Sequence, residues 1–131
     1  MALDEGALDL DLLAASLRAD ASDVNAFVES LATKLEDAVP DCTRVERRRA
    51  GLLGPKQVRR IALDAGSNRL ELLRDEGGVV QTRCSRLSGG IVLKTEPLET
   101  EAWIAALGQA LAAEAGRNER TRQALERLLT N

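Results

Sequence analysis

The feature that most constrains the fold is a change in the spacing of apolar residues along the chain. From about residue 43 to residue 95, apolar and polar side chains alternate, as they do in strands that bury one face. Short segments rich in Gly, Ser, Asn and Asp interrupt the alternation four times, and connections that short join antiparallel neighbours. The pattern predicts an antiparallel β-meander of four to five strands over about 43–95. The expected strands are 43–49, 57–64, 68–74, 79–86 and 90–95.

The two faces of this meander differ in character. Large apolar side chains fall on one face, which we expect to turn inward, while arginines with a few acids fall on the other. The inward set is Val45, Ile61, Leu63, Leu70, Leu72, Val80, Ile91 and Leu93. One face of the sheet is therefore available for helices to cover.

Before the meander, the apolar spacing is helical. A stripe that includes Val24 and Leu35 at spacings of three and four predicts a helix over about 22–38, and Pro40 ends it. A leucine pattern further upstream predicts a shorter helix over about 9–19. We expect these N-terminal helices to flank the sheet.

After the meander, helical spacing returns. A stripe around Trp103 predicts a helix over about 99–115. The amphipathic pattern over 116–129 either continues this helix or folds back as a separate piece. We expect an α+β fold in which these helices pack on one face of the sheet.

The length of 131 residues is that of one domain. We expect a single domain over 1–131, with a core of about 20–115 and amphipathic extensions at 1–19 and 116–131. Leu125, Leu128 and Leu129 form an apolar stripe in the second extension, and we interpret them as a self-association surface.

The composition argues against catalysis. The chain has no His, which removes the commonest general acid–base group and the commonest transition-metal ligand. Its two cysteines, Cys42 and Cys84, are far apart in sequence, have strand-like neighbours and are interpreted as small buried apolar residues. We therefore expect a non-enzymatic protein with no cofactor and no metal.

Charge is distributed unevenly along the chain. Residues 1–41 carry ten acids and two bases, whereas residues 42–94 carry twelve bases and five acids. The basic residues gather in one expected hairpin, 44–60, where a polyanion or a partner protein would contact them. They are Arg44, Arg47, Arg48, Arg49, Lys56, Arg59 and Arg60. The competing interpretation is a solvated ribbon that pairs with the acidic N-terminal helices or with another protein.

Two features bear on where the protein resides. No run of apolar residues approaches the length of about 20 that a membrane-spanning helix needs. The N-terminal residues Met1–Gly6 lack the positive start and apolar stretch of a signal peptide. We expect a cytoplasmic protein without a membrane span.

Three resemblances accompany this outline. The order helix, antiparallel meander, helix resembles the small dimeric nucleoid-associated proteins typified by YbaB. The stretch 98–107, which holds Trp103, resembles the closing helix of pleckstrin-homology-like domains. The stretches Gly54–Gly66 and Ser88–Glu96 are similar to an uncharacterised protein family of high-GC Gram-positive bacteria, a resemblance that implies no activity.

These observations lead to two hypotheses about function. The first is a non-enzymatic protein-interaction module, a homodimeric adaptor or regulator. The alternative is a nucleic-acid-binding protein, including a DNA-binding one, that uses the basic hairpin 44–60.

Overall fold

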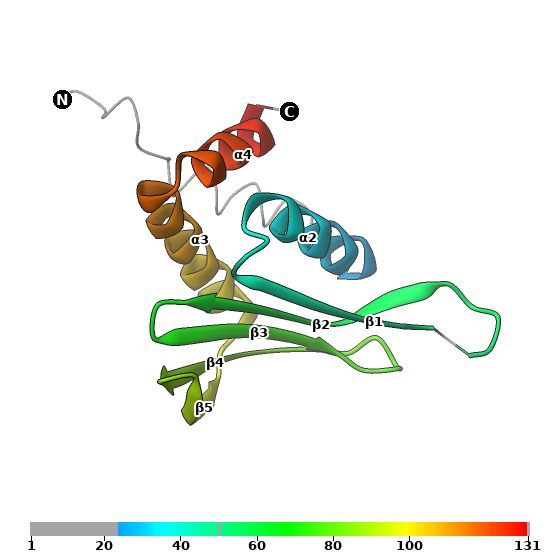
Figure 1. Ribbon diagram of the computed structural model, residues 1–131. Coiled ribbons are helices and arrows are strands. Elements are labelled where there is room, and N and C mark those ends of the chain that lie inside the picture. The colour runs from blue at the N-terminus through cyan, green and yellow to red at the C-terminus, as the bar shows by residue number, and fades with distance from the viewer. Residues whose placement is uncertain (1–23, 50, 131) are drawn as a thin grey trace.

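The computed structural model describes residues 24–49 and 51–130, which form one antiparallel sheet and three helices (Figure 1). The sheet has five strands in the order β1-β2-β3-β4-β5, so each strand pairs with its neighbour in the sequence. This arrangement confirms the predicted α+β fold and the antiparallel meander. The elements are α2 (Val24–Ala38), β1 (Thr43–Arg49), β2 (Lys56–Ala65), β3 (Asn68–Arg74), β4 (Val80–Ser88), β5 (Ile91–Pro97), α3 (Thr100–Arg117) and α4 (Glu119–Thr130). The predicted helix over 9–19 lies outside the described residues.

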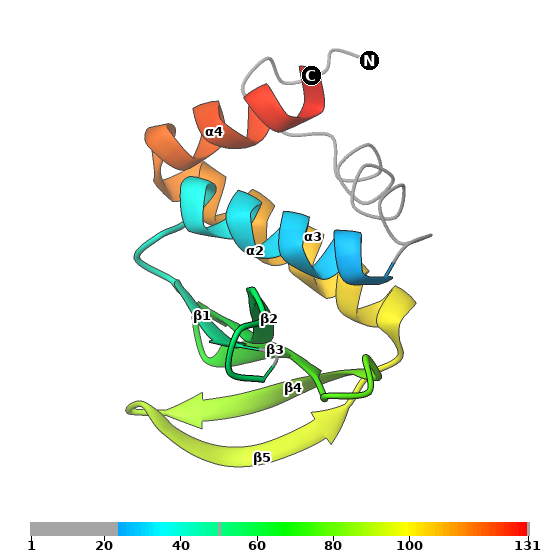
Figure 2. The ribbon, with the colours of Figure 1, turned by 90° about the vertical axis from the view of Figure 1, so that its right-hand side faces the viewer.

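The helices form a layer on one side of the sheet (Figure 2). α2 packs on β1 and β2, α3 packs on β3 and β4, and α4 packs on the other two helices. Two apolar stripes hold the layers together, one around Leu31 on α2 and one around Trp103 on α3. Burying each large side chain of these stripes contributes about 1.5–3 kcal/mol. The stripes meet Ile61 and Leu72, both fully buried, in the middle of the sheet.

The C-terminal region folds back instead of continuing α3. Asn118 adopts an extended backbone conformation that interrupts the helix. Its side-chain Oδ1 accepts hydrogen bonds from the N–H groups of Arg120 (3.0 Å) and Thr121 (3.3 Å), which caps the start of α4. α4 then places Ala124 and Leu125 in the core. The predicted core boundary near 115 is therefore too early.

The sheet has a bare edge at β5. All seven residues of this strand are exposed, including Ile91 at 68% and Leu93 at 62%. The prediction that these two residues face inward is therefore wrong, although the strand itself is present. Since β5 is the last strand in the sheet order and shifts register against β4 after Arg86, its apolar side chains lie outside the helix-covered core.

The two-residue β4–β5 loop depends on its glycines. Gly89 and Gly90 have φ angles of 57° and 82°, in the left-handed region that residues with a side chain rarely adopt. Positive φ at both loop positions is the requirement of the tightest hairpin turns. This pair fixes where β5 turns back along β4.

Candidate interaction surfaces

The basic residues predicted from the sequence lie together on the β1–β2 hairpin. The strands pair so that Arg49 lies opposite Lys56 and Arg48 lies opposite Gln57. The register shifts between Glu46 and Arg47, which places a bulge in the middle of the hairpin. Both strands continue beyond the N-terminal start of α2, so the turn between them projects from the rest of the described chain (Figure 1).

Two of the seven basic residues are neutralised by acids. Arg47 donates two hydrogen bonds to Glu36 of α2, at 3.0 and 2.6 Å, and these bonds hold the pKa of Glu36 below its usual value. Arg60 donates to Glu71 at 2.9 Å and to Glu46 at 3.3 Å. Arg47 is thus paired with an acid of α2, and Arg60 is paired with two acids of the sheet.

The other five retain their charge. The side chains of Arg44, Arg48, Arg49 and Lys56 make no hydrogen bond or ion pair with any residue in the described ranges. Arg59 donates to the main-chain oxygen of Asp75 at 2.7 Å, which satisfies a donor without cancelling the charge. A depression of about 380 Å³ beside these side chains is lined by Arg48, Arg49, Arg59, Arg60, Glu46, Leu73, Arg74, Asp75 and Glu76. The local charge is positive.

The loop at the end of this hairpin carries two exposed leucines. Leu52 is 94% exposed and Leu53 is 97% exposed, so each side chain is almost entirely in solvent. Both lie between the unpaired Arg49 and Lys56 in the sequence. We call the set Arg48, Arg49, Leu52, Leu53 and Lys56 the hairpin tip.

A second surface is the outer edge of β5. This strand pairs with β4 and with no other strand in the part of the chain that the structure describes. Ile91, Val92 and Leu93 form three consecutive exposed apolar residues there. Next to them Lys94 forms an ion pair with Glu96 at 2.7 Å, and Thr95 shares a 2.8 Å hydrogen bond with Ser85 of β4. An unpaired edge of this kind is a site where another strand can add.

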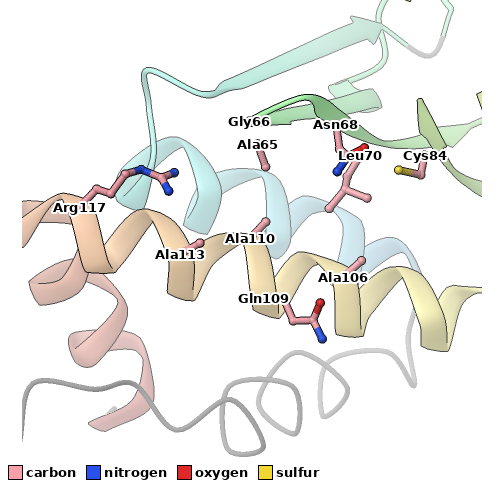
Figure 3. Close-up of a pocket in the computed structure, with 10 residues that line it drawn as sticks. All are labelled: Ala65, Gly66, Asn68, Leu70, Cys84, Ala106, Gln109, Ala110, Ala113 and Arg117. Atoms are coloured by element: carbon pink, nitrogen blue, oxygen red, sulfur yellow. The ribbon is translucent and has the colours of Figure 1, made fainter. Parts of the chain in front are cut away.

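A third surface is a groove of about 410 Å³ between α3 and the sheet (Figure 3). Small apolar residues form most of its walls, with polar groups at intervals. The lining residues are Ala65, Gly66, Asn68, Leu70, Cys84, Ala106, Gln109, Ala110, Ala113 and Arg117. The small apolar residues give the groove a largely apolar lining.

The cysteine in this groove is not activated. Burial raises the pKa of the Cys84 thiol and the nearby Glu96 carboxylate raises it further, against a smaller opposing effect of Arg86. Burial likewise raises the pKa of Cys42. Because the thiolate is the nucleophilic form, both thiols are weak nucleophiles at neutral pH. The Cys84 thiol therefore gives this groove no activated nucleophile.

The leucines predicted for self-association lie mostly against the chain itself. Leu125 is 1% exposed and belongs to the core, so it offers no surface to a partner in this fold. Leu128 and Leu129 are partly buried and pack against the same core. The structure thus leaves β5, rather than α4, as the main exposed apolar segment of regular structure.

The structure also reveals a buried arginine that sequence reasoning missed. The Arg74 side chain is 2% exposed and donates to the Val58 main-chain oxygen (3.0 Å), to Asn25 Oδ1 (2.9 Å) and to Glu29 Oε2 (2.8 Å). Glu29 Oε2 also accepts from the Val58 N–H at 2.8 Å. Val58 pairs with Arg47 of β1, but the β2–β3 pairing stops at Arg60–Leu73. The side chains of Arg74 and Glu29 therefore take the place of a β3 partner for Val58. No local pattern signals this role, since the partners are far apart in sequence.

A second network lies on the face of the sheet away from the helices. Glu71 is 4% exposed and accepts hydrogen bonds from Arg60 (2.9 Å) and Arg83 (3.1 Å). Burial alone would raise the pKa of Glu71, but the bonds from Arg83 and Arg60 outweigh it and lower the pKa below its usual value. The alternation of charged residues on neighbouring strands is the sequence signal for this network.

Three further findings bear on function. Within residues 24–49 and 51–130, no group of three or more His, Cys, Asp or Glu side chains is placed to hold a metal ion. None of the described helices is long and apolar enough to cross a membrane. In comparisons with family models, curated proteins and solved structures, nothing matches the chain. The resemblance to an uncharacterised bacterial family therefore stays a prediction.

Proposed function

We propose that this chain is a non-enzymatic protein-interaction module that forms a homodimer through β5 and acts as an adaptor or regulator of another protein. The observation that supports it best is the bare edge at β5, where three consecutive apolar residues are exposed. Soluble proteins usually protect such an edge, because unpaired N–H and C=O groups recruit other strands. Pairing with a second copy would cover it.

The direction of the main-chain groups on β5 supports a specific pairing. Leu98 N–H donates to the Thr82 oxygen at 2.9 Å. The main-chain N–H and C=O groups of Leu98 therefore face β4, and so do those of every second residue before it. By this alternation, the N–H and C=O of Thr95 point away from β4. Thr95 is therefore the natural centre of an added antiparallel strand.

The sequence of β5 is complementary to itself around that centre. In a two-fold antiparallel pair with Thr95 opposite Thr95, Lys94 lies opposite Glu96 of the second copy, and this pairing occurs twice. Leu93 lies opposite Pro97, whose missing N–H removes one bond of that pair. Centring the pair on Lys94 would instead set lysine against lysine. Charge complementarity thus favours a second copy of this chain as the strand that adds to β5.

A charge-swap experiment tests the homodimer. In K94E both charged positions of β5 are acidic, and in E96K both are basic, so each variant would oppose like charges across its own dimer. An equimolar mixture would restore both opposite-charge pairs. We expect light scattering over a concentration series to show dimers for the wild type and the mixture, and each single variant to dimerise about tenfold or more weakly.

The matched control is R120E, which changes an exposed arginine on α4 whose side chain makes no hydrogen bond or ion pair with other described residues. This variant should dimerise like the wild type. A wild-type chain that stays monomeric at all concentrations would overturn the homodimer. Dimers that persist equally in K94E and E96K would place the interface elsewhere and overturn the role of β5.

The alternative function, nucleic-acid binding, would use the five unneutralised cations of the β1–β2 hairpin. Phosphate contacts alone need only such cations. Single-strand binders also use aromatic side chains to stack bases, and both large rings of this chain, Phe27 and Trp103, are buried in the core. The hairpin therefore supports this alternative less well than β5 supports the homodimer.

A further inference from the structure

The loop between β1 and β2 differs from the other loops of the sheet. Gly66-Ser67, Asp75–Val79 and Gly89-Gly90 connect the other strands with mostly small or polar residues, as solvated turns usually do. The β1–β2 loop instead presents Leu52 and Leu53 side by side, more than nine-tenths exposed. A turn at this position needs no leucine for its geometry. The fold therefore does not need these two side chains, and they can contact an apolar surface outside the protein.

The strands that lead into this loop carry a charge conflict. Arg49 and Lys56 are direct cross-strand partners, and like charges at such positions repel. Neither they nor Arg48 pairs with an acid elsewhere in the described chain. An anion bound at the hairpin tip would relieve this repulsion. Asp75 and Glu76 of the β3–β4 loop line the same depression as Arg48 and Arg49 but form no ion pair with them.

We propose that the hairpin tip docks on an anionic lipid surface, with Leu52 and Leu53 inserted at the boundary between head groups and acyl chains. Arg48, Arg49 and Lys56 then lie at the level of the lipid phosphates. Peripheral proteins bind membranes by this combination of a small inserted apolar area and cations that contact anionic head groups. A nucleic acid would use the cations but has no place for two leucines. This inference does not rest on β5 or on dimer formation.

Co-sedimentation with vesicles tests the proposal. The probes are vesicles of phosphatidylcholine alone and of phosphatidylcholine mixed with phosphatidylglycerol. We expect binding to the mixed vesicles that weakens with added salt, and little binding to phosphatidylcholine alone. The double variant L52N/L53N should bind about tenfold weaker or worse, because each leucine contributes buried apolar area. R48E should bind about fivefold weaker or worse, since each cation near the surface adds about that factor.

One variant serves as a matched control at another site. R120E makes the same charge change as R48E, on α4 and away from both the hairpin tip and β5. It should bind the mixed vesicles like the wild type. Because Leu52 and Leu53 contact so little of the protein, L52N/L53N should also keep the wild-type circular dichroism spectrum and unfolding midpoint.

The same proteins are titrated with labelled duplex DNA and single-stranded RNA. Absence of vesicle binding overturns the proposal whatever the nucleic acids do. Nucleic-acid binding that L52N/L53N leaves unchanged, together with absent vesicle binding, assigns the hairpin to nucleic acid instead. The proposal is also overturned if the protein binds both kinds of vesicle equally, or if L52N/L53N binds the mixed vesicles as strongly as the wild type. If K94E abolishes dimers but keeps vesicle binding, the lipid contact stands apart from the proposed homodimer.

Discussion

Replacing Arg74 tests whether side chains can stand in for a strand at the end of the β2–β3 ladder. The change Arg74→Ala removes three hydrogen bonds and leaves the Val58 oxygen without its donor. The bond to Val58 is buried and charge-assisted, so its loss costs about 1.5 kcal/mol. Glu29 is 44% exposed, which limits that ion pair to about 0.5–1 kcal/mol. The bond to the exposed Asn25 adds about 0.5 kcal/mol.

The aliphatic part of Arg74 adds a packing contribution. Truncation to Ala removes two buried methylene groups beyond Cβ, worth about 0.8 kcal/mol each. Together with the polar losses, the free energy of unfolding should fall by about 4 kcal/mol for Arg74→Ala. Arg74→Met keeps the aliphatic stem and should lose about 2–3 kcal/mol, which is the polar part alone.

Urea unfolding followed by far-ultraviolet circular dichroism measures these losses. We expect the dependence on urea to keep its slope while the midpoint falls, because the surface exposed on unfolding hardly changes. Buried ion pairs can often be replaced by apolar residues without loss of stability. Arg74→Met is therefore the more demanding test of the two variants. If Arg74→Met is as stable as the wild type, the bonds to Val58 contribute no net stability and the reasoning is refuted.

Two further predictions concern stability. The folded-state pKa of Glu71 lies below its usual value, so its stabilising effect is present above the usual carboxyl pKa of 4.5 and is lost as pH falls through the lowered value. Glu71→Gln should therefore lower the stability at pH 7 and make the loss of stability on acidification smaller than in the wild type. Unfolding midpoints at neutral and acid pH measure both effects. Thr121 Oγ1 donates to the Ala38 oxygen at 3.0 Å, joining α4 to the end of α2. Thr121→Val should cost about 1 kcal/mol in urea unfolding, and no change would show that this buried bond contributes nothing.

Much of the fold was predictable because its signals are local. Alternation in 43–95 and the glycine-rich turns set the number, direction and order of the strands, since each strand pairs with its sequence neighbour. The helical stripes around Leu31 and Trp103 identified the helices that cover the sheet. In a meander with short loops, such local patterns leave few alternative topologies.

The features that were not predictable depend on contacts between distant residues. Alternation places Arg74 on the same face as Leu70 and Leu72. Nothing local indicates that its side chain is held there by Asn25 and Glu29, which are far from it in sequence. Conversely, the alternation that correctly places Leu72 inside predicts the same for Leu93. Alternation says which residues share a face, whereas burial also needs a helix above that face. Only the three-dimensional structure shows that the helix layer leaves β5 bare.

Ion pairs between α2 and the sheet account for part of the uneven charge distribution. The acidic stretch 1–41 and the basic stretch 42–94 suggested that the two halves of the chain neutralise each other. Within the described residues, α2 contributes Glu29 and Glu36 to ion pairs with the sheet, and their partners are Arg74 and Arg47. These pairs lie where α2 covers the sheet, and the hairpin continues past that cover. The cations of the hairpin tip pair with no acid among the described residues. Salt should therefore weaken whatever binds the tip and affect the helix–sheet pairs less, because screening acts most strongly on exposed charges.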